Sequence, residues 1–363
     1  MSTDSDLKKA IGDVAIPGLP HTIGDLGRVI QASVTDDKVM VEISLGFPAK
    51  RLLPEIESAV RQLLADSEVP ADIELQIRSR VSSHAVQKNM KPLKNVKNII
   101  AIASGKGGVG KSTTAVNLAL ALADEGASVG ILDADIYGPS QPLMLGLSGQ
   151  RPESDDGETM ETLQAHGLQV MSIGFLVDPD QPMIWRGPMV TSALNQLLQQ
   201  TNWNNLDYLI VDMPPGTGDI QLTLSQQVPV SGAVIVTTPQ DIALLDARRG
   251  LQMFKKVAVP VLGVIENMST HVCSSCGHEE AIFGSGGGQK MADDFELELL
   301  GQLPLDAMIR EQTDSGNPTV VSAPDSPQAE AYRNAATRMA VRMALQNKDF
   351  SHRFAPIVVE GVG

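Results

Sequence analysis

The stretch Gly105-Lys106-Gly107-Gly108-Val109-Gly110-Lys111-Ser112-Thr113 fits the pattern G-x-x-x-x-G-K-[ST] of a phosphate-binding loop. An apolar run at 98–103 predicts a buried strand before the loop, and the apolar spacing at 112–124 predicts a helix after it. Strand, glycine loop and helix form the context that this motif requires, which disfavours a chance glycine turn. The sequence therefore predicts a nucleotide site, with backbone N–H groups around the phosphates, Lys111 on the β- and γ-phosphates and the Ser112 hydroxyl on Mg²⁺.

A second lysine, Lys106, directly follows the first glycine of this loop. The surrounding sequence, SGKGGVGKSTTAVNLA, resembles the deviant phosphate-binding loop of the MinD/ParA/ArsA/nitrogenase-iron-protein class. The resemblance implies that Lys106 reaches across a dimer to the nucleotide of the partner chain. The alternative is an ordinary solvated surface lysine.

Polar residues and a glycine follow three further predicted strands. In an open α/β sheet, ligands bind beyond the carboxyl ends of the strands, so these positions are candidates for the same site. Asp212 ends a buried strand and is expected to hold Mg²⁺ directly or through water, and the Gly216 amide is placed to sense the γ-phosphate. By resemblance to the class, Asp135 orients the attacking water and Asn267 contacts the adenine, while Asp133 is a metal-supporting or strand-end residue.

The order of predicted elements indicates two domains in the 363 residues. From residue 98 to 350, strands and helices alternate, which predicts an α/β domain with a mostly parallel sheet flanked by helices. Residues 1–85 predict a small α+β domain, residues 86–97 a polar linker, and residues 351–363 an uninformative tail. His84, near the linker, is expected to be solvated.

The small N-terminal domain resembles a unit found alone, or ahead of ATPases, in iron–sulfur assembly proteins. Many such domains carry a cysteine after the second strand, whereas this chain reads Gly46-Phe47-Pro48-Ala49-Lys50 there. A turn at Asp36-Asp37 is expected between its first two strands. Without the cysteine, a docking or packing role is favoured over direct cluster binding.

Composition excludes several classes of protein. The net charge of −15 argues against a nucleic-acid or anionic-membrane surface, and no apolar run approaches the roughly 20 residues of a membrane span. The N-terminus has no secretory apolar region, so a cytoplasmic location is expected. The chain contains two cysteines, Cys273 and Cys276, which excludes a secreted disulfide framework and favours metal-binding or redox use.

The two cysteines have the spacing C-x-x-C, which suits soft metals. A 4Fe–4S cluster takes about four thiolates, so one chain cannot supply them and two chains facing each other can. The rival is zinc within one chain, bound by His271, Cys273, Cys276 and His278, although the short spacings make it hard for both histidines to turn inward. A disulfide is disfavoured in a reducing cytosol.

Six segments together carry a close resemblance to a known family: GKGGVGKST, DADIYGPSQP, IWRGPM, DMPPGTGD, ENMS and CSSCGH. They resemble the Mrp/ApbC family of iron–sulfur cluster carrier ATPases over about residues 95–350. The resemblance implies a homodimer with slow Mg²⁺-dependent ATPase activity. It would accept a 4Fe–4S cluster from scaffold proteins and transfer it to apo iron–sulfur proteins, with no nucleic-acid or membrane partner.

Two alternatives remain open. One is a positioning ATPase like MinD or ParA, which needs a basic amphipathic C-terminal helix or a basic face; Arg338 and Arg342 are too few for that. The other is a nucleotide-dependent docking protein with structural zinc.

Overall fold

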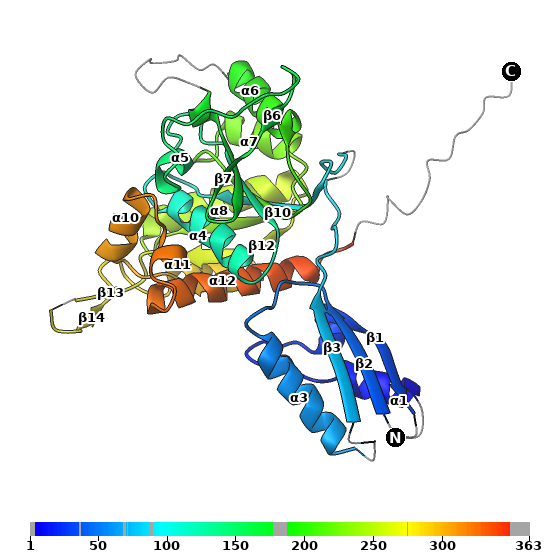
Figure 1. Cartoon of the computed structure of the whole chain (residues 1–363). Helices are drawn as coiled ribbons and strands as arrows, with labels where there is room; N and C mark the ends of the chain where they lie inside the picture. The colour runs from blue at the N-terminus through cyan, green and yellow to red at the C-terminus, as the bar shows by residue number, and fades with distance from the viewer. Residues whose placement is uncertain are drawn as a thin grey trace, which may run out of the picture.

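The computed structural model describes residues 4–35, 38–67, 70, 72–87, 90–176, 187–273 and 275–348. The expected turn at Asp36-Asp37, the IWR part of IWRGPM and the tail lie outside these residues. Figure 1 shows a small N-terminal unit below a larger α/β unit.

The small unit is a three-stranded sheet with helices packed on it. Its elements are α1 (Asp4–Gly12), α2 (Ile23–Leu26), β1 (Gly27–Val34), β2 (Lys38–Leu45), α3 (Leu53–Ala65) and β3 (Asp72–Ser79). The central strand β2 buries every second side chain, because successive residues of a strand point to opposite faces. The expected α+β fold of this region is confirmed.

The large unit is built on an eight-stranded sheet with the order β15-β12-β11-β4-β10-β5-β8-β7. Its strands are β4 (Val96–Ala103), β5 (Val129–Asp133), β7 (Leu163–Ala165), β8 (Leu168–Ser172), β10 (Leu206–Asp212), β11 (Gly232–Thr237), β12 (Val261–Glu266) and β15 (Leu299–Gln302). The described pairs are parallel except for β7 with β8 at one edge. The central strands are apolar almost throughout because helices cover both faces. The predicted α/β fold with a mostly parallel sheet is confirmed.

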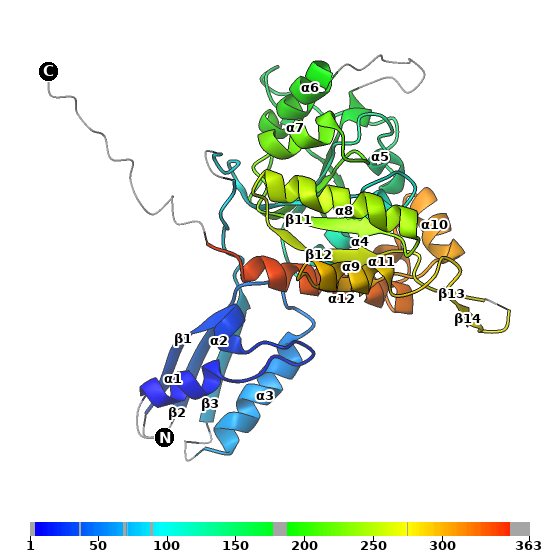
Figure 2. The same ribbon diagram turned by 180° about the vertical axis from the view of Figure 1, so that it is seen from behind.

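Helices lie on both faces of this sheet. Those of the large unit are α4 (Lys111–Asp124), α5 (Gln141–Met144), α6 (Gly187–Gln199), α7 (Asp219–Gln227), α8 (Asp241–Lys256), α9 (Gly287–Asp294), α10 (Ala307–Asp314), α11 (Thr319–Ser322) and α12 (Pro327–Ala344), with a 3-10 turn at Ile173–Phe175. Figure 1 shows α4 and α12 on the near face, and Figure 2, seen from behind, shows α8 across the other. Short strand pairs complete the unit: β6 (Met160–Glu161) with β9 (Thr201–Asn202), and β13 (His271–Val272) with β14 (Glu279–Glu280).

The connecting segment packs against the large unit, and the expectation of a solvated His84 is wrong. Its side chain is buried, and its Nδ1 lies 2.8 Å from Oδ1 of Asn98 on β4. Burial lowers the pKa of His84 because the charged form loses hydration. Gln87 is buried too and donates to the carbonyls of Ser225 and Val228 at 2.8 and 3.2 Å. The segment was predicted to be a linker because it has few apolar residues. Its contacts with the large unit are made by polar side chains, which the apolar pattern does not reveal.

An ion pair joins the two units at the far end of the phosphate-loop helix. Arg51 contacts the carboxylate of Glu125, the residue that follows α4, and also Glu330 of α12 at 2.7 Å. The backbone N–H of Lys50 donates to the Glu125 carbonyl at 3.3 Å. Within the expected Gly46–Lys50 stretch, Phe47 and Ala49 are fully buried, which is consistent with a packing role for this turn.

Candidate functional site

The glycine loop between β4 and α4 is confined on two sides. A Cβ on Gly105 would lie 2.1 Å from the backbone carbon of Asp246, so only glycine lets α8 approach this closely. Gly110 has φ +79 and would place a Cβ 2.1 Å from Nδ2 of Asn267. Val109 is buried, although Gly107 and Gly108 just before it are exposed. The backbone of the loop therefore has a defined path into the start of α4, where helix N–H groups attract anions.

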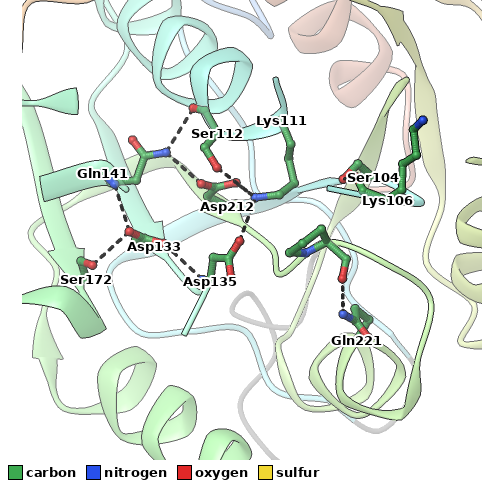
Figure 3. Close-up of polar contacts among 11 residues, drawn as sticks. Ser104, Lys106, Lys111, Ser112, Asp133, Asp135, Gln141, Ser172, Asp212 and Gln221 are labelled. Carbon is green, nitrogen blue, oxygen red and sulfur yellow. Dashed lines mark hydrogen bonds and ion pairs between the residues drawn. The ribbon is translucent and has the colours of Figure 1, made fainter. Parts of the chain in front are cut away.

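Lys111 lies in a buried cluster of carboxylates at the ends of β5 and β10. Its Nζ forms an ion pair with Asp212, lies 3.1 Å from the Ser112 hydroxyl and lies 3.9 Å from Asp135. Figure 3 shows these side chains converging on Lys111. Asp133 sits beside Asp212 because the parallel register of the strands pairs the two residues. The structure thus brings together Lys111, Ser112, Asp135 and Asp212, and their roles toward a nucleotide and Mg²⁺ stay predictions.

Burial controls the protonation of this cluster. Burial, together with the nearby charge of Asp212, raises the pKa of Asp133 to about 7. Burial also raises the pKa of Asp135, while Lys111 acts in the opposite direction. The cause is the loss of hydration of the charged carboxylates, with one lysine beside several of them. Groups perturbed in this way are typical of functional sites.

The oxygen atoms of this cluster fit Mg²⁺ bound together with phosphates. Ser112 and Asp212 offer a hydroxyl and a carboxylate, which are hard ligands of the kind Mg²⁺ takes. Among the described residues, no group of three or more His, Cys, Asp or Glu side chains is arranged to hold a metal ion by itself. Mg²⁺ at nucleotide sites is usually held by one or two side chains together with the phosphates.

The remaining predicted residues of the nucleotide site lie around the loop. The Lys106 carbonyl accepts a hydrogen bond from the Ser104 hydroxyl at 2.9 Å. In Figure 3 the side chain of Lys106 points away from Lys111. The Gly216 N–H donates to the Ser104 carbonyl at 2.9 Å, which ties the Pro-Pro-Gly turn to the loop. Nδ2 of Asn267 donates to the Val109 carbonyl at 2.9 Å. Thr113 lies in the first turn of α4. The roles of Lys106 across a dimer, of the Gly216 amide and of Asn267 at adenine stay predictions.

Gln141, the first residue of α5, was missed by the sequence reasoning although it lies within the quoted motif DADIYGPSQP. It is fully buried, its Nε2 donates to Asp212 at 2.9 Å and to the Ser112 carbonyl at 3.1 Å, and its backbone N–H donates to Asp133 at 3.0 Å. A glutamine beside a proline carries no periodic or charge signal. Only the meeting of three chain segments in space identifies it.

The two cysteines lie on the hairpin of β13 and β14. Figures 1 and 2 show this hairpin projecting sideways from the large unit, at the level of α12. Cys276 is exposed and Cys273 half-buried, and both are free thiols. Hydrogen bonds from the backbone N–H groups of Ser275 and Cys276 lower the pKa of the Cys273 thiol. The turn therefore stabilises the thiolate, the form that binds metals, relative to an ordinary cysteine.

The described residues do not assemble the four-ligand zinc site that was the rival interpretation. His271 is engaged elsewhere, with its Nδ1 2.9 Å from the Leu305 carbonyl. As stated above, the described side chains contain no group of three candidate ligands, so His271 and His278 do not join the cysteines. Within the described part of the chain, the hairpin offers two sulfur ligands on an exposed turn.

Comparison with known proteins places these features in a family. Residues 95–340 match the family model described as NUBPL iron-transfer P-loop NTPase, and residues 4–76 match the one described as iron-sulfur cluster assembly protein. The chain belongs to the iron-transfer P-loop NTPase family. The resemblance drawn from the motifs is therefore confirmed.

Curated relatives agree with this assignment over most of the chain. The iron-sulfur cluster carrier protein of Escherichia coli (strain K12) is 52% identical over 333 residues, covering 92% of this chain and 90% of the relative. The iron-sulfur cluster transfer protein NUBPL of Mus musculus is 52% identical over 286 residues, covering 78% of this chain and 88% of the relative.

Solved structures support the fold of the large unit. A nucleotide-binding protein from Archaeoglobus fulgidus, solved in complex with ADP, has 35% identity and a TM-score of 0.57, covering 65% of this chain and 91% of that one. The cell division ATPase MinD of Pyrococcus furiosus has 24% identity and a TM-score of 0.51, covering 67% and 98%, and shows the shared fold alone. Among the described residues, no helix is long and apolar enough to cross a membrane.

Proposed function

We propose that this chain is an ATP-binding and ATP-hydrolysing carrier, which holds a 4Fe–4S cluster between two copies of itself and passes it to apo iron–sulfur proteins. The observation that carries the proposal is the C-x-x-C turn with its exposed Cys276 and with the pKa of Cys273 lowered by backbone hydrogen bonds, in a chain that also contains a complete phosphate loop. The names of the relatives in E. coli and mouse support the cargo.

The nucleotide site supplies the hydrolysis. Lys111 and the loop N–H groups bind the β- and γ-phosphates, and Ser112 and Asp212 would hold Mg²⁺, which would supply positive charge beside the phosphates. Asp135 orients the attacking water. Burial raises the pKa of Asp135, which makes its carboxylate a better proton acceptor. Asn267 and Gly216 contact the adenine and the γ-phosphate. The rate is slow because one chain leaves Lys106 turned away from its own cluster of charges.

The dimer completes both sites. Lys106 of each chain reaches the nucleotide of the other, and the C-x-x-C turns of the two chains meet across a two-fold axis. Two chains then supply about four thiolates, the number that a 4Fe–4S cluster takes. Nucleotide-dependent dimer geometry thereby controls how firmly the cluster is held.

The partners follow from the cargo. Scaffold proteins donate the cluster and apo iron–sulfur proteins receive it in the cytoplasm, with no nucleic acid or membrane involved, as the charge of −15 favours. The N-terminal domain serves docking or packing, consistent with its ion-paired contact to the end of α4.

The test is anaerobic reconstitution with iron and sulfide, followed by metal analysis and size measurement. We expect iron–sulfide charge-transfer bands, about two irons per chain and a dimer. A colourless protein that retains zinc, or a full cluster on a strictly monomeric chain, contradicts the proposal.

A further inference from the structure

The side chain of Gln141 joins three segments that each carry part of the nucleotide site. Its Nε2 bonds Asp212 at the end of β10 and the Ser112 carbonyl in α4, while its backbone N–H bonds Asp133 at the end of β5. Figure 3 shows it on the side of Asp212 opposite to Lys111. The two oxygens of Asp212 are thus held separately, one by Lys111 and one by Gln141.

The orientation of the Gln141 amide follows from its partners. Both atoms that its Nε2 contacts are oxygens that can only accept, so a flipped amide would set oxygen against oxygen. In this orientation Oε1 is buried and has no hydrogen-bond partner among the described residues. Leaving a polar atom in that condition costs about 1–3 kcal/mol, so the donor contacts must offset that penalty.

Gln141 also anchors the loop that carries Asp135. At one end of this loop the Asp135 N–H donates to Asp133 at 3.2 Å, and at the other end Gln141 donates to the second oxygen of the same carboxylate. The Ser172 hydroxyl adds a bond to that second oxygen at 3.1 Å. The loop is therefore held to the sheet edge by Asp133 and to the metal ligands by Gln141.

We propose that Gln141 is a positioning residue for Mg²⁺, which orients the Asp212 carboxylate and keeps α5 against the Ser112 turn so that both ligands face the metal together. It contacts two residues that hold the metal in the function proposed above, and so acts through them. Groups of this kind, one step removed from a metal, typically change metal affinity by about 10–100-fold when they are replaced.

The chain contains a matched control in Gln87. This glutamine is also buried, its Nε2 also donates to two acceptors, and its Oε1 also lacks a partner among the described residues. Its acceptors, Ser225 and Val228, belong to the end of α7 rather than to the nucleotide cluster. Gln87→Met and Gln141→Met therefore remove the same chemistry at two places.

The experiment measures binding of a fluorescent ADP analogue to the full chain, prepared without iron, during titration with MgCl₂ and in EDTA. We expect Gln141→Met to need about 10–100-fold more Mg²⁺ for half of the metal-dependent change. Its affinity in EDTA should stay near that of the wild type, and Gln87→Met should follow the wild type throughout. Wild-type Mg²⁺ dependence in Gln141→Met, or an equal shift in both variants, overturns the proposal. Because no cluster is present, the result is independent of the carrier function.

Discussion

The nucleotide site and the cysteine hairpin differ in how much of each site one chain builds. At the nucleotide site, Lys111, Asp212 and Gln141 are buried, and Lys111 and Gln141 each contact Asp212. At the hairpin, Cys273 and Cys276 lie on an exposed two-stranded turn and offer two ligands. The first site is organised by the sheet edge within one chain. The second offers two thiols, so in the function proposed above a second chain completes it.

The largest effect should come from removing either cysteine, because the proposed cluster site has no spare ligand. Cys273→Ala and Cys276→Ala should each lower the iron content after reconstitution from about two per chain to the background, while ATP binding stays unchanged. The measurement is iron and sulfide analysis beside nucleotide binding on the same samples.

The matched control replaces the neighbouring histidines. His271→Ala with His278→Ala should leave the cluster in place, since the Nδ1 of His271 already contacts the Leu305 carbonyl. A cluster that survives loss of one cysteine, or that disappears with the two histidines, would show that the ligands are assigned wrongly.

Variants of the two loop lysines should separate what one chain contributes to ATP hydrolysis from what the dimer contributes. Lys111→Ala should reduce hydrolysis by at least about 100-fold, because it removes the cation that faces the transferred phosphate. It should also destabilise the chain by about 3 kcal/mol, since the buried Asp212 carboxylate loses its ion-pair partner.

Lys106→Ala should bind ATP and remain as stable as the wild type, yet fail to hydrolyse it. Its side chain is half-buried and lies apart from the carboxylate cluster, so its charge is available to a partner chain. Steady-state ATPase assays and denaturant unfolding of both variants make the comparison. Wild-type hydrolysis by Lys106→Ala would exclude a role across the dimer.

The sequence was sufficient to predict the fold and which residues meet at one edge of the sheet, because both follow from local order. The phosphate loop, Asp135 and Asp212 follow buried strands, and strand ends converge at one edge of a parallel sheet. Gln141 and His84 were missed or misjudged because their roles come from contacts with distant segments, at Asp212 and Asn98 respectively. Periodicity reports burial of apolar side chains and gives no signal for a buried amide or imidazole that is satisfied by tertiary contacts.

The packed connecting segment gives a prediction of intermediate size. A chain that begins at Arg80 and one that begins at Lys94 both lack the N-terminal domain, and both should bind ATP. The shorter one should be less stable by about 3 kcal/mol, because it loses the buried Val81 together with the hydrogen bonds of His84 and Gln87. Denaturant unfolding of the two truncated chains tests this, and equal midpoints would mean that the segment is only a tether.

The smallest effect concerns how the buried Asp133 carboxyl makes the free energy of unfolding depend on pH. Asp133 titrates near 3.8 in an unfolded chain and at about 7 in the folded one. Between these pH values the folded chain holds a proton that the unfolded chain has released, so stability falls as the pH rises through this window. From about pH 5.5 to about pH 8 the loss should be about 2 kcal/mol, and it should be absent in Asp133→Asn, which cannot ionise.

Asp156 provides the control for this titration, since hydrogen bonds from the backbone N–H groups of Thr159 and Glu158 lower its pKa to about 2. It is ionised in both the folded and the unfolded chain above about pH 5.5, so Asp156→Asn should keep the wild-type slope across the same window. The measurement is denaturant unfolding at the two pH values for the wild type and both variants.

If the free energy of unfolding of Asp133→Asn falls with pH as much as that of the wild type, the proton is held elsewhere in the cluster. If its free energy of unfolding gains about 2 kcal/mol on the wild type toward high pH, the buried carboxylate edge carries uncompensated charge. That charge would then be available to bind a divalent cation.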